Sequence, residues 1–140
     1  MTQEDVKHWF DALSEGNVTP LTDRLTGDCV LEFPGSTFGG EFRGSRRVRV
    51  FLRQNQRLFD GGLRFTLHWV MVTDAAAVAQ WTNAGRTKQG SPYANRGVTI
   101  FRRRGEKIER IEDYLDTEIL ARTWPGRGHS EPADDAPEPA

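Results

Sequence analysis

The sequence predicts an α+β fold in which a curved antiparallel sheet wraps around helices from the N-terminal half of the chain. Apolar residues recur at helical spacing as far as residue 59, and from residue 63 onward they alternate with polar ones. Strict alternation gives each strand one dry and one wet face, and helices are available to cover only one side of the sheet. Such a sheet curls around its helices, so we expect a cone-shaped domain with an internal cavity.

Three helices are expected before the alternating segment. The first begins at Thr2, which together with Asp5 has the spacing of a capping pair, and it runs to about residue 15. A short second helix starts at Thr19-Pro20, where threonine suits the cap and proline suits the first turn. The third helix spans 45–59. A short strand over 29–34 and a glycine-rich loop precede it.

Four strands follow, over 63–72, 76–87, 93–103 and 107–115. Asp116 then stands directly before a short helix over 117–124, and capping of that helix is the stronger interpretation of its side chain. Pro125-Gly126 ends this helix. We therefore expect one domain over 1–125, followed by a disordered, acidic, proline- and alanine-rich tail over 126–140.

Composition limits the partners of this chain. It has 19 basic and 20 acidic side chains. The arginines between 43 and 57 spread around a helix rather than along one stripe, which favours a solvated helix face over a phosphate-binding patch. We therefore expect no nucleic-acid partner. No segment has the length and hydrophobicity of a signal peptide or a membrane span, so we expect no membrane partner and a cytoplasmic location.

The single cysteine is expected to be structural. Cys29 lies beside Val30 and Leu31, and no histidine stands at a spacing that would make it a nucleophile, so a buried apolar role is favoured. No cluster of His, Asp and Glu has metal-ligand spacing. We therefore expect neither a metal ion nor another cofactor.

The most informative residue is Asp113, which lies in the last strand between Ile111 and Leu115. A lone buried carboxylate costs free energy unless it is paired or used. Two interpretations follow. Asp113 is an inward-facing general base, or it is a structural acid that points outward or pairs with an arginine such as Arg96 or Arg110.

Two motifs add to the order of the elements, namely LEFPG followed by GGEFRG, and the ending GEKIERIEDYLD. Together these features resemble the SnoaL-like branch of the nuclear transport factor 2-like superfamily, which includes ketosteroid isomerases, polyketide cyclases, limonene epoxide hydrolases and scytalone dehydratases. The resemblance covers residues 3 to about 122 and implies a cone-shaped barrel of the cystatin-like type. It implies little about the reaction, because this fold hosts many chemistries.

The resemblance transfers some functional residues and not others. The final strand of limonene epoxide hydrolases is similar to residues 112–116, which gives Asp113 their water-activating role, and SnoaL-type polyketide cyclases have an aspartate near the same place. The epoxide hydrolases also use an arginine and a second aspartate, two residues apart on the strand that corresponds to 78–87. The alignment places Gln80 and Thr82 there, so their triad is absent.

Ketosteroid isomerases have their base just after the first strand, where the nearest carboxylate of this chain is Glu32. If Glu32 faces the cavity, a dyad with Asp113 would separate their two pKa values, although on an alternating strand Glu32 equally faces water. His68 is either a group that polarises a carbonyl or an exposed strand histidine. The candidate pocket residues are Trp9, Glu32, Phe33, Phe38, Thr82 and Asn95.

These observations predict an enzyme that performs general acid/base chemistry without a cofactor. Asp113 takes a proton from carbon or from water, and a neutral donor among Gln80, Tyr93 and His68 stabilises the developing oxyanion. The ligand is expected to be small, largely apolar and oxygenated, and isomerisation, cyclisation, dehydration and water addition all fit. The alternative is a non-catalytic ligand-binding or dimerisation module of the same fold.

The outer sheet face is the expected site of association with a second copy. Trp69 and Trp81 are candidates either to line the pocket with other aromatic residues or to cover that face, where this superfamily commonly forms dimers. We therefore expect a homodimer through the outer face of the sheet.

Overall fold

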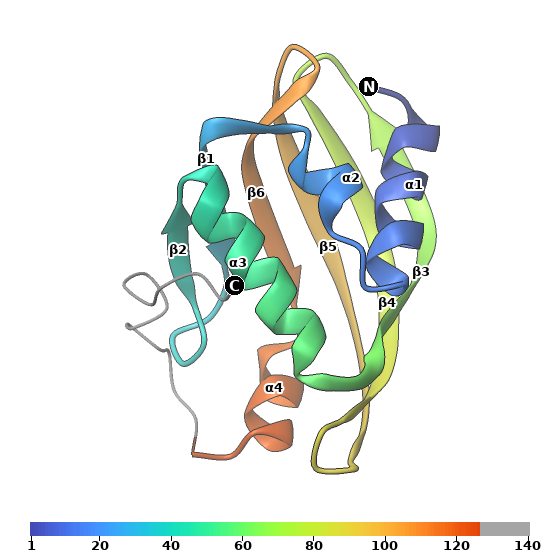
Figure 1. The fold of residues 1–140 in the computed structure, drawn as a ribbon, viewed down its shortest axis with the longest axis vertical. Coiled ribbons are helices and arrows are strands. Elements are labelled where there is room, and N and C mark those ends of the chain that lie inside the picture. The colour runs from blue at the N-terminus through green and yellow to red at the C-terminus, as the bar shows by residue number, and fades with distance from the viewer. Residues whose placement is uncertain (127–140) are drawn as a thin grey trace.

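The computed structural model describes residues 1–126 and confirms the α+β fold. Its elements in chain order are α1 (Gln3–Ser14), α2 (Thr19–Thr22), β1 (Leu25–Phe33), β2 (Gly40–Arg43), α3 (Ser45–Arg57), β3 (Phe59–Val72), β4 (Ala76–Thr87), β5 (Pro92–Arg104), β6 (Lys107–Leu115) and α4 (Thr117–Thr123). The strands form one sheet in the order β2-β1-β6-β5-β4-β3, with β2 and β3 as its edges, so the sheet is not closed into a barrel. Figure 1 shows α1, α2 and α3 on the same side of the curved sheet. The tail predicted over 126–140 lies, apart from Gly126, outside the described residues.

Two predicted helix caps are present. Thr2 and Asp5 form a capping box at the start of α1, in which the Thr2 hydroxyl accepts a hydrogen bond from the Asp5 backbone N–H at 3.1 Å. The Asp116 carboxylate accepts from the backbone N–H groups of Glu118 and Ile119 at the start of α4. These bonds satisfy N–H groups that have no partner within the helix, so capping is the role of Asp116.

Several boundaries, caps and pairings differ from the prediction. β1 begins at Leu25 and β3 at Phe59, both earlier than expected, and Val18 takes the cap position of α2 that was expected for Thr19. The third helix ends at Arg57, because Phe59 already pairs with Thr87 in the sheet. The expected loop over 35–44 contains β2, which pairs with β1 in antiparallel fashion. The sheet is also not antiparallel throughout, since β1 runs parallel to β6 with Leu31 opposite Ile111. A parallel neighbour requires a long crossover, and the whole segment between β1 and β6 supplies it.

The inner face of β4 and β5 carries buried side chains at alternate positions, namely Ala77, Ala79, Trp81, Asn83, Tyr93, Asn95, Thr99 and Phe101. Of the intervening residues of β4, Gln80, Thr82 and Ala84 are exposed on the outer face. Two positions were expected for Trp81, the pocket or the outer face, and the outer one is wrong, because its phase along β4 is that of the small buried alanines.

β3 changes phase in its middle. Its pairing with β4 shifts between Leu67 and Trp69, so Trp69 and Met71 are exposed whereas Val70 packs against the core. One extra residue in a strand reverses the face of every residue after it. This irregularity explains why His68 and Trp69 are exposed at consecutive positions.

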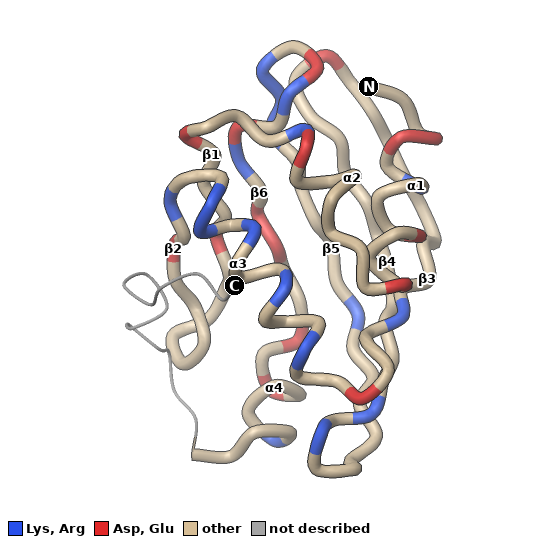
Figure 2. Tube along the Cα trace, viewed as in Figure 1, with Lys and Arg blue, Asp and Glu red and all other residues tan. Residues whose placement is uncertain are grey.

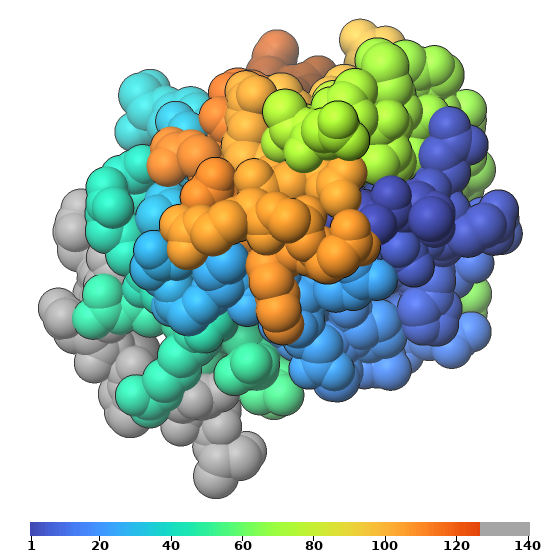
Figure 3. Space-filling model, turned by 90° about the horizontal axis from the view of Figure 1, so that it is seen from above, coloured from blue at the N-terminus to red at the C-terminus, as the bar shows by residue number. Residues whose placement is uncertain are grey.

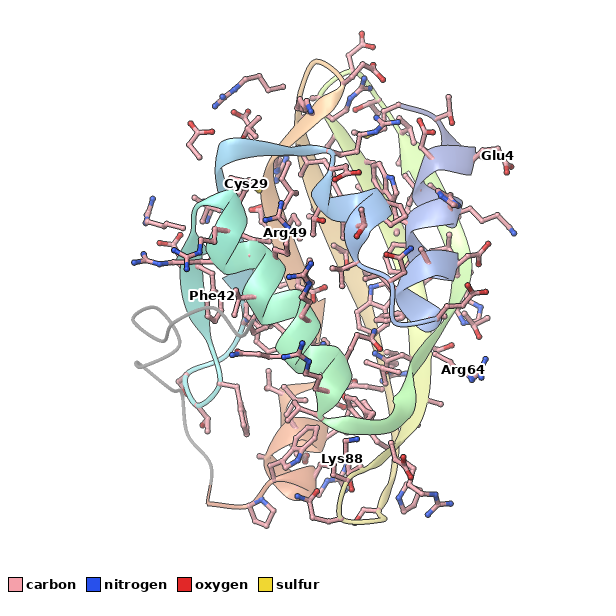
Figure 4. The ribbon with its side chains drawn as sticks, in the orientation of Figure 1. Glu4, Cys29, Phe42, Arg49, Arg64 and Lys88 are labelled. Carbon is pink, nitrogen blue, oxygen red and sulfur yellow. The ribbon has the colours of Figure 1, made fainter. Side chains whose placement is uncertain are left out.

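Two apolar clusters fill the space between the sheet and the helices. In the larger one, the Trp9 ring of α1 meets the Phe101 ring of β5 edge-on, with 5.4 Å between centroids. Figure 4 shows Phe42 between β2 and α3, where its ring centroid lies 4.4 Å from that of Phe51. Cys29 belongs to the same cluster, and its burial raises the pKa of the thiol to about 12, in agreement with an apolar structural role. The smaller cluster joins β3, β5 and α4.

The surface is uneven in charge and polarity. Figure 2 shows basic residues along α3, whose buried side chains are Val48 and Val50. Seen from the end that carries the turn between β5 and β6, the molecule is covered by packed side chains (Figure 3).

The outer sheet face carries three large apolar side chains that are nearly half exposed, Trp69, Met71 and Tyr114. Within residues 1–126, no helix has the length and hydrophobicity to span a membrane.

Candidate functional site

A cavity of about 70 Å³ lies between the inner face of the sheet and the helices. The central strands β4, β5 and β6 contribute polar groups to it, namely those of Trp81, Asn83, Tyr93, Thr99 and Asp113. Most of the remaining wall is apolar and consists of Phe10, Leu13, Leu21, Leu31, Phe33, Phe51, Leu52, Phe59, Leu63, Phe65, Phe101, Ile111, Leu115, Leu120 and Trp124. A mostly apolar cavity with a few convergent polar groups is the usual form of a small-molecule site.

Asp113 stands in the wall of this cavity. Ile111 and Leu115, two residues away on either side, line the same cavity, as the alternation of β6 requires. Burial raises the pKa of the Asp113 carboxyl from an ordinary value of 3.8 to about 6, because an apolar surrounding disfavours the charged form. Among residues 1–126, no arginine compensates for this cost. Arg110 instead pairs with Glu32, so the outward and arginine-paired interpretations of Asp113 do not fit its surroundings.

A chain of two hydrogen bonds holds the Asp113 carboxylate. The Trp81 indole N–H donates to the Thr99 hydroxyl at 2.8 Å, and that hydroxyl donates to Asp113 Oδ1 at 2.6 Å. The Thr99 bond lowers the pKa of Asp113 and so partly opposes the effect of burial. Within the described part of the chain, Asp113 Oδ2 has no hydrogen-bond partner. One oxygen is therefore fixed and the other is available to a ligand.

Tyr93 supplies a neutral donor to the same cavity. Its hydroxyl accepts a hydrogen bond from Asn95 Nδ2 at 2.9 Å, which leaves its own proton for a ligand. Burial raises the pKa of Tyr93, and the charges of Asp113 and Asp116 add to this effect, so the phenol keeps its proton at neutral pH.

Asn95 was expected to contact the ligand, but it supports Tyr93 from behind. Its Nδ2 also donates to the Asp116 carbonyl at 3.1 Å, and its Oδ1 accepts from the backbone N–H groups of Arg96 and Asp116 at 2.7 and 3.2 Å. The amide is thus fully occupied and does not line the cavity. Its bonds fix the Tyr93 hydroxyl relative to the start of α4.

Asn83 differs from Asn95 in its hydrogen bonding and in its position relative to the cavity. It lies opposite Asn95 in the register of β4 and β5, and it does line the cavity. Asn83 is buried, and its Oδ1 has no hydrogen-bond partner within the described residues. An unpaired buried carbonyl oxygen is rare in proteins and calls for an explanation.

An aromatic group closes the cavity beside α4. The rings of Phe59, Tyr93 and Trp124 lie within contact of one another, with 5.0, 5.7 and 5.8 Å between their centroids. Aromatic pairs at these separations attract each other beyond their buried area. The group gives the cavity an aromatic wall of mutually tilted rings next to the Tyr93 hydroxyl.

Three predicted site residues lie on the wrong side of the sheet. Gln80, His68 and Thr82 line a separate hollow on the outer face together with Arg96 and Tyr114. His68 Nε2 is 2.8 Å from the Thr82 hydroxyl, so these two side chains bind each other. The structure does not bring any of the three to Asp113, because their phase along the strands points them away from the helices.

Of the remaining predicted pocket residues, one lines the cavity and the others lie elsewhere. Phe33 lines the cavity. Trp9 is buried in the larger core cluster and contributes no wall, and Phe38 packs at the edge of the smaller cluster. Glu32 is part of a surface ion pair, with Arg110 Nη2 donating to its Oε1 at 2.6 Å, so the dyad of Glu32 and Asp113 does not form.

Sequence reasoning missed two residues of the site, Asn83 and Thr99, and left Trp81 open between the pocket and the outer face. A signal for them was present, since Asn83 and Trp81 share the phase of the buried Ala79 on β4. The two cavity-facing positions two apart on this strand are therefore Trp81 and Asn83, in place of Gln80 and Thr82. Neither an arginine nor an aspartate stands there, so the epoxide-hydrolase triad is still absent in the corrected alignment.

The assembled groups define what this site can do. From the sheet it offers one buried carboxylate, one neutral hydroxyl donor and one unpaired amide, and α3 adds the amides of Asn55 and Gln56 to a mostly apolar wall. Among the described residues, no group of three or more His, Cys, Asp or Glu side chains is arranged to hold a metal ion. The polar groups suit proton transfer and the binding of an uncharged polar group.

Known structures share this architecture. A nuclear transport factor 2-like protein from Anabaena variabilis is 26% identical, with a TM-score of 0.70 over 80% of this chain and 84% of that chain. An LEH-like epoxide hydrolase from M. tuberculosis is 21% identical, with a TM-score of 0.66 over 85% of each chain. A ketosteroid isomerase-like fold from Catenulispora acidiphila, in complex with trimethylamine, is 22% identical, with a TM-score of 0.72 over 98% of this chain and 100% of that chain. No curated protein matches this chain.

The family assignment rests on the sequence match as well as on the fold. The family model described as a SnoaL-like domain matches residues 6–111, which includes every strand from β1 to β5 and most of β6. Asp113 follows two residues after the matched segment, on the same strand. The chain belongs to the SnoaL-like domain family, with the nuclear transport factor 2-like fold.

Proposed function

We propose that this SnoaL-like protein is a small-molecule enzyme that transfers protons without a cofactor, with Asp113 as its general base. One observation carries the proposal, namely a carboxylate buried in the wall of an apolar cavity with a pKa raised to about 6. Thr99 is its hydrogen-bond donor, and no cation accompanies it within the described residues. A raised pKa near the working pH is what a general base requires.

The chemistry follows from the protonation states. At pH 7 a carboxyl group of pKa about 6 is mostly ionised, and its poor solvation makes it a stronger base than a surface carboxylate. Asp113 takes a proton from carbon or water at its unbonded Oδ2. Tyr93 keeps its own proton and donates a hydrogen bond to the oxygen on which negative charge develops. Isomerisation, cyclisation, dehydration and water addition can each begin with such a step.

The cavity favours a small, largely apolar, oxygenated ligand. Its volume is about 70 Å³, and apolar side chains form most of its wall. Similar folds support a small-molecule role, since the M. tuberculosis relative is described as an epoxide hydrolase and the C. acidiphila relative binds trimethylamine. The polar groups are too few to bind a highly charged substrate.

Exchange of carbon-bound protons tests the base directly. In D2O, we expect the protein to accelerate loss of the α-proton signals of acetone and cyclopentanone in ¹H NMR spectra. The rate should rise with pH through about 6 and then level off, because the ionised form of Asp113 is the active one. Asp113→Asn keeps the shape of the side chain and should lower the accelerated rate by about 100-fold or more.

An exposed acid serves as the control for this variant. Asp74→Asn, in the turn between β3 and β4, should leave both the exchange rate and its pH profile unchanged. If Asp113→Asn exchanges the ketone protons as fast as the wild-type protein, Asp113 is not the base.

The second candidate function is a non-catalytic ligand-binding module. The observation that favours it is that Asp113 and Tyr93 are the titratable side chains found in the cavity wall over residues 1–126. The arginine and second aspartate of the epoxide-hydrolase arrangement have no equivalent at Trp81 and Asn83. A wild-type protein that binds small ketones without exchanging their protons would have this function.

We also propose that a second copy of the chain covers the outer sheet face. Trp69, Met71 and Tyr114 lie on this face and are each nearly half exposed. Large apolar side chains gathered on one face favour association, and a two-fold pair of identical faces is the commonest form of it. The cavity lies on the inner face, so the dimer would leave it accessible.

A further inference from the structure

We propose that Asn83 determines which ligands the cavity accepts, by accepting a hydrogen bond from an O–H or N–H group of the ligand. The inference deepens the proposed function and rests on it for the location of the reaction. Asn83 is only 7% exposed, it lines the cavity, and its Oδ1 has no hydrogen-bond partner within residues 1–126. Since nearly all buried polar atoms are paired, a molecule in the cavity supplies the missing donor.

The surrounding groups do not provide an alternative partner, and neither Asn55 nor Gln56, the two amides that α3 contributes to the cavity wall, bonds to this oxygen. Thr99 commits its hydroxyl proton to Asp113, and the Trp81 indole N–H is committed to Thr99. Asn95, directly opposite in the sheet, uses its Nδ2 on Tyr93 and on a backbone carbonyl. The neighbouring polar side chains of the inner face are thus bonded to each other, and Asn83 alone among them has an unpaired buried oxygen.

The three cavity groups together specify the ligand class. The Asn83 carbonyl oxygen needs a donor, the Tyr93 hydroxyl needs an acceptor, and Asp113 takes a proton. A hydroxyl group satisfies the first two requirements, and an apolar body suits the wall. The site therefore selects a hydroxyl- or N–H-bearing compound over a hydrocarbon or an ether of the same size. A ligand without such a donor leaves the buried Asn83 oxygen unpaired and therefore binds more weakly.

A pair of nearly isosteric probes tests this selection. Phenol and toluene differ by a hydroxyl in place of a methyl group, and each can be titrated into ¹⁵N-labelled protein with the amide shifts of β4 and β5 as the readout. We expect the wild-type protein to bind phenol more tightly than toluene. In Asn83→Leu this preference should fall by about fivefold, the worth of one neutral hydrogen bond.

The stability of the unliganded protein separates a ligand-binding role from a structural one. Asn83→Leu removes an unpaired acceptor and adds apolar surface next to a cavity, so its melting temperature should equal or exceed that of the wild-type protein. A residue retained for the fold would lower the melting temperature when replaced. Asn83→Ala adds no bulk and should lose the same preference for phenol, so the test stands even if leucine fits poorly.

Thr66→Val is the matched control, because Thr66 is exposed on the outer face of the adjacent strand. It should keep the wild-type preference. The proposal is overturned if the wild-type protein does not favour phenol, if the preference survives in both Asn83 variants, or if Asn83→Leu is destabilised together with Asn83→Ala. Failure of the proposed function is distinguishable, since it is read from ketone exchange by Asp113→Asn and not from the phenol preference.

Discussion

The Thr99 hydroxyl has one proton, and its partners Trp81 and Asp113 determine to which group that proton is donated. The Trp81 indole can only donate, so Thr99 accepts from it and must direct its own proton to Asp113. The sequence indicated an inward Asp113 through the apolar Ile111 and Leu115. It did not indicate Thr99, because that contact depends on the register in which β5 pairs with β6.

Replacement of Thr99 by valine should make Asp113 a weaker acid. Thr99 lowers the pKa of the carboxyl, so its removal leaves the effect of burial unopposed. We expect the midpoint of the pH–rate profile for ketone exchange to move up by about one unit, since a hydrogen bond to a charged group is worth about 1.5–3 kcal/mol. Direct titration of the Asp113 carboxyl carbon by NMR would measure the same shift.

Thr99→Ser provides the matched control, because serine keeps the hydroxyl and loses only a methyl group. Its pKa for Asp113 should stay close to the wild-type value. Thr99→Val also leaves the Trp81 N–H without an acceptor, which should lower the free energy of unfolding by about 1–3 kcal/mol. An unchanged pKa in Thr99→Val would show that the hydroxyl does not act on the carboxylate.

The burial of Asp113 also predicts how stability depends on pH. Its pKa is about 6 in the folded protein and near 3.8 when unfolded, so the folded state holds the proton more tightly. Stability from this group is present below pH 4 and is lost as the pH rises through 6. Relative to Asp113→Asn, the wild-type protein should lose about 2 kcal/mol between pH 3.5 and pH 8, allowing for water in the cavity. Urea unfolding of both proteins at the two pH values would measure this difference, and an equal change in both would contradict it.

At the scale of the elements, the sequence predicted where strands lie better than which way their side chains face. β4 and β6 were predicted with their observed bounds. Gln80 was nevertheless assigned to the cavity that Trp81 and Asn83 in fact line. Alternation defines two faces without saying which is inner, and the shift at Leu67 in β3 reverses the phase within one strand. Such irregularities arise from pairing between strands and are not visible in one strand alone.

Gly97 of β5 lies against Tyr114 of β6 and Trp81 of β4, so it affects how these strands position the site. A Cβ at this position would lie 2.4 Å from the Tyr114 carbonyl oxygen and 2.6 Å from the Trp81 ring. Trp81 therefore occupies the space that a side chain at Gly97 would take. We expect Gly97→Ala to lower the free energy of unfolding by about 1–3 kcal/mol. Because Trp81 bonds to Thr99, the variant should also slow ketone exchange.

Gly27→Ala is the control for this substitution. Gly27 also lies in a strand, β1, and a Cβ there would have no atom within 4 Å. Its unfolding transition in urea should lie close to that of the wild-type protein. If Gly97→Ala unfolds at the same urea concentration as Gly27→Ala, the Trp81 ring has room to move and is not fixed by Gly97.

At the scale of the whole molecule, the fold has two faces with different tasks. The inner face is the side on which α1, α2 and α3 lie (Figure 1), and its side chains line the cavity. The outer face has no covering element within the described residues and presents Trp69, Met71 and Tyr114. The sequence predicted this division, because one set of helices can cover only one side of an alternating sheet. The pattern of apolar and polar residues does not identify what covers the outer face, because that depends on association with another chain.

Association through the outer face predicts that a charge at Trp69 separates the copies. Trp69 is 48% exposed on this face, so Trp69→Lys removes apolar surface and sets two like charges near each other across a two-fold interface. We expect a dimer for the wild-type protein and a monomer for the variant in sedimentation velocity. Lys7→Ala, on the exposed side of α1, should remain dimeric. Ketone exchange should persist in the monomer, because the groups that line the cavity all belong to one chain. A wild-type monomer, or a dimer that Trp69→Lys leaves intact, would show that this face is not the interface.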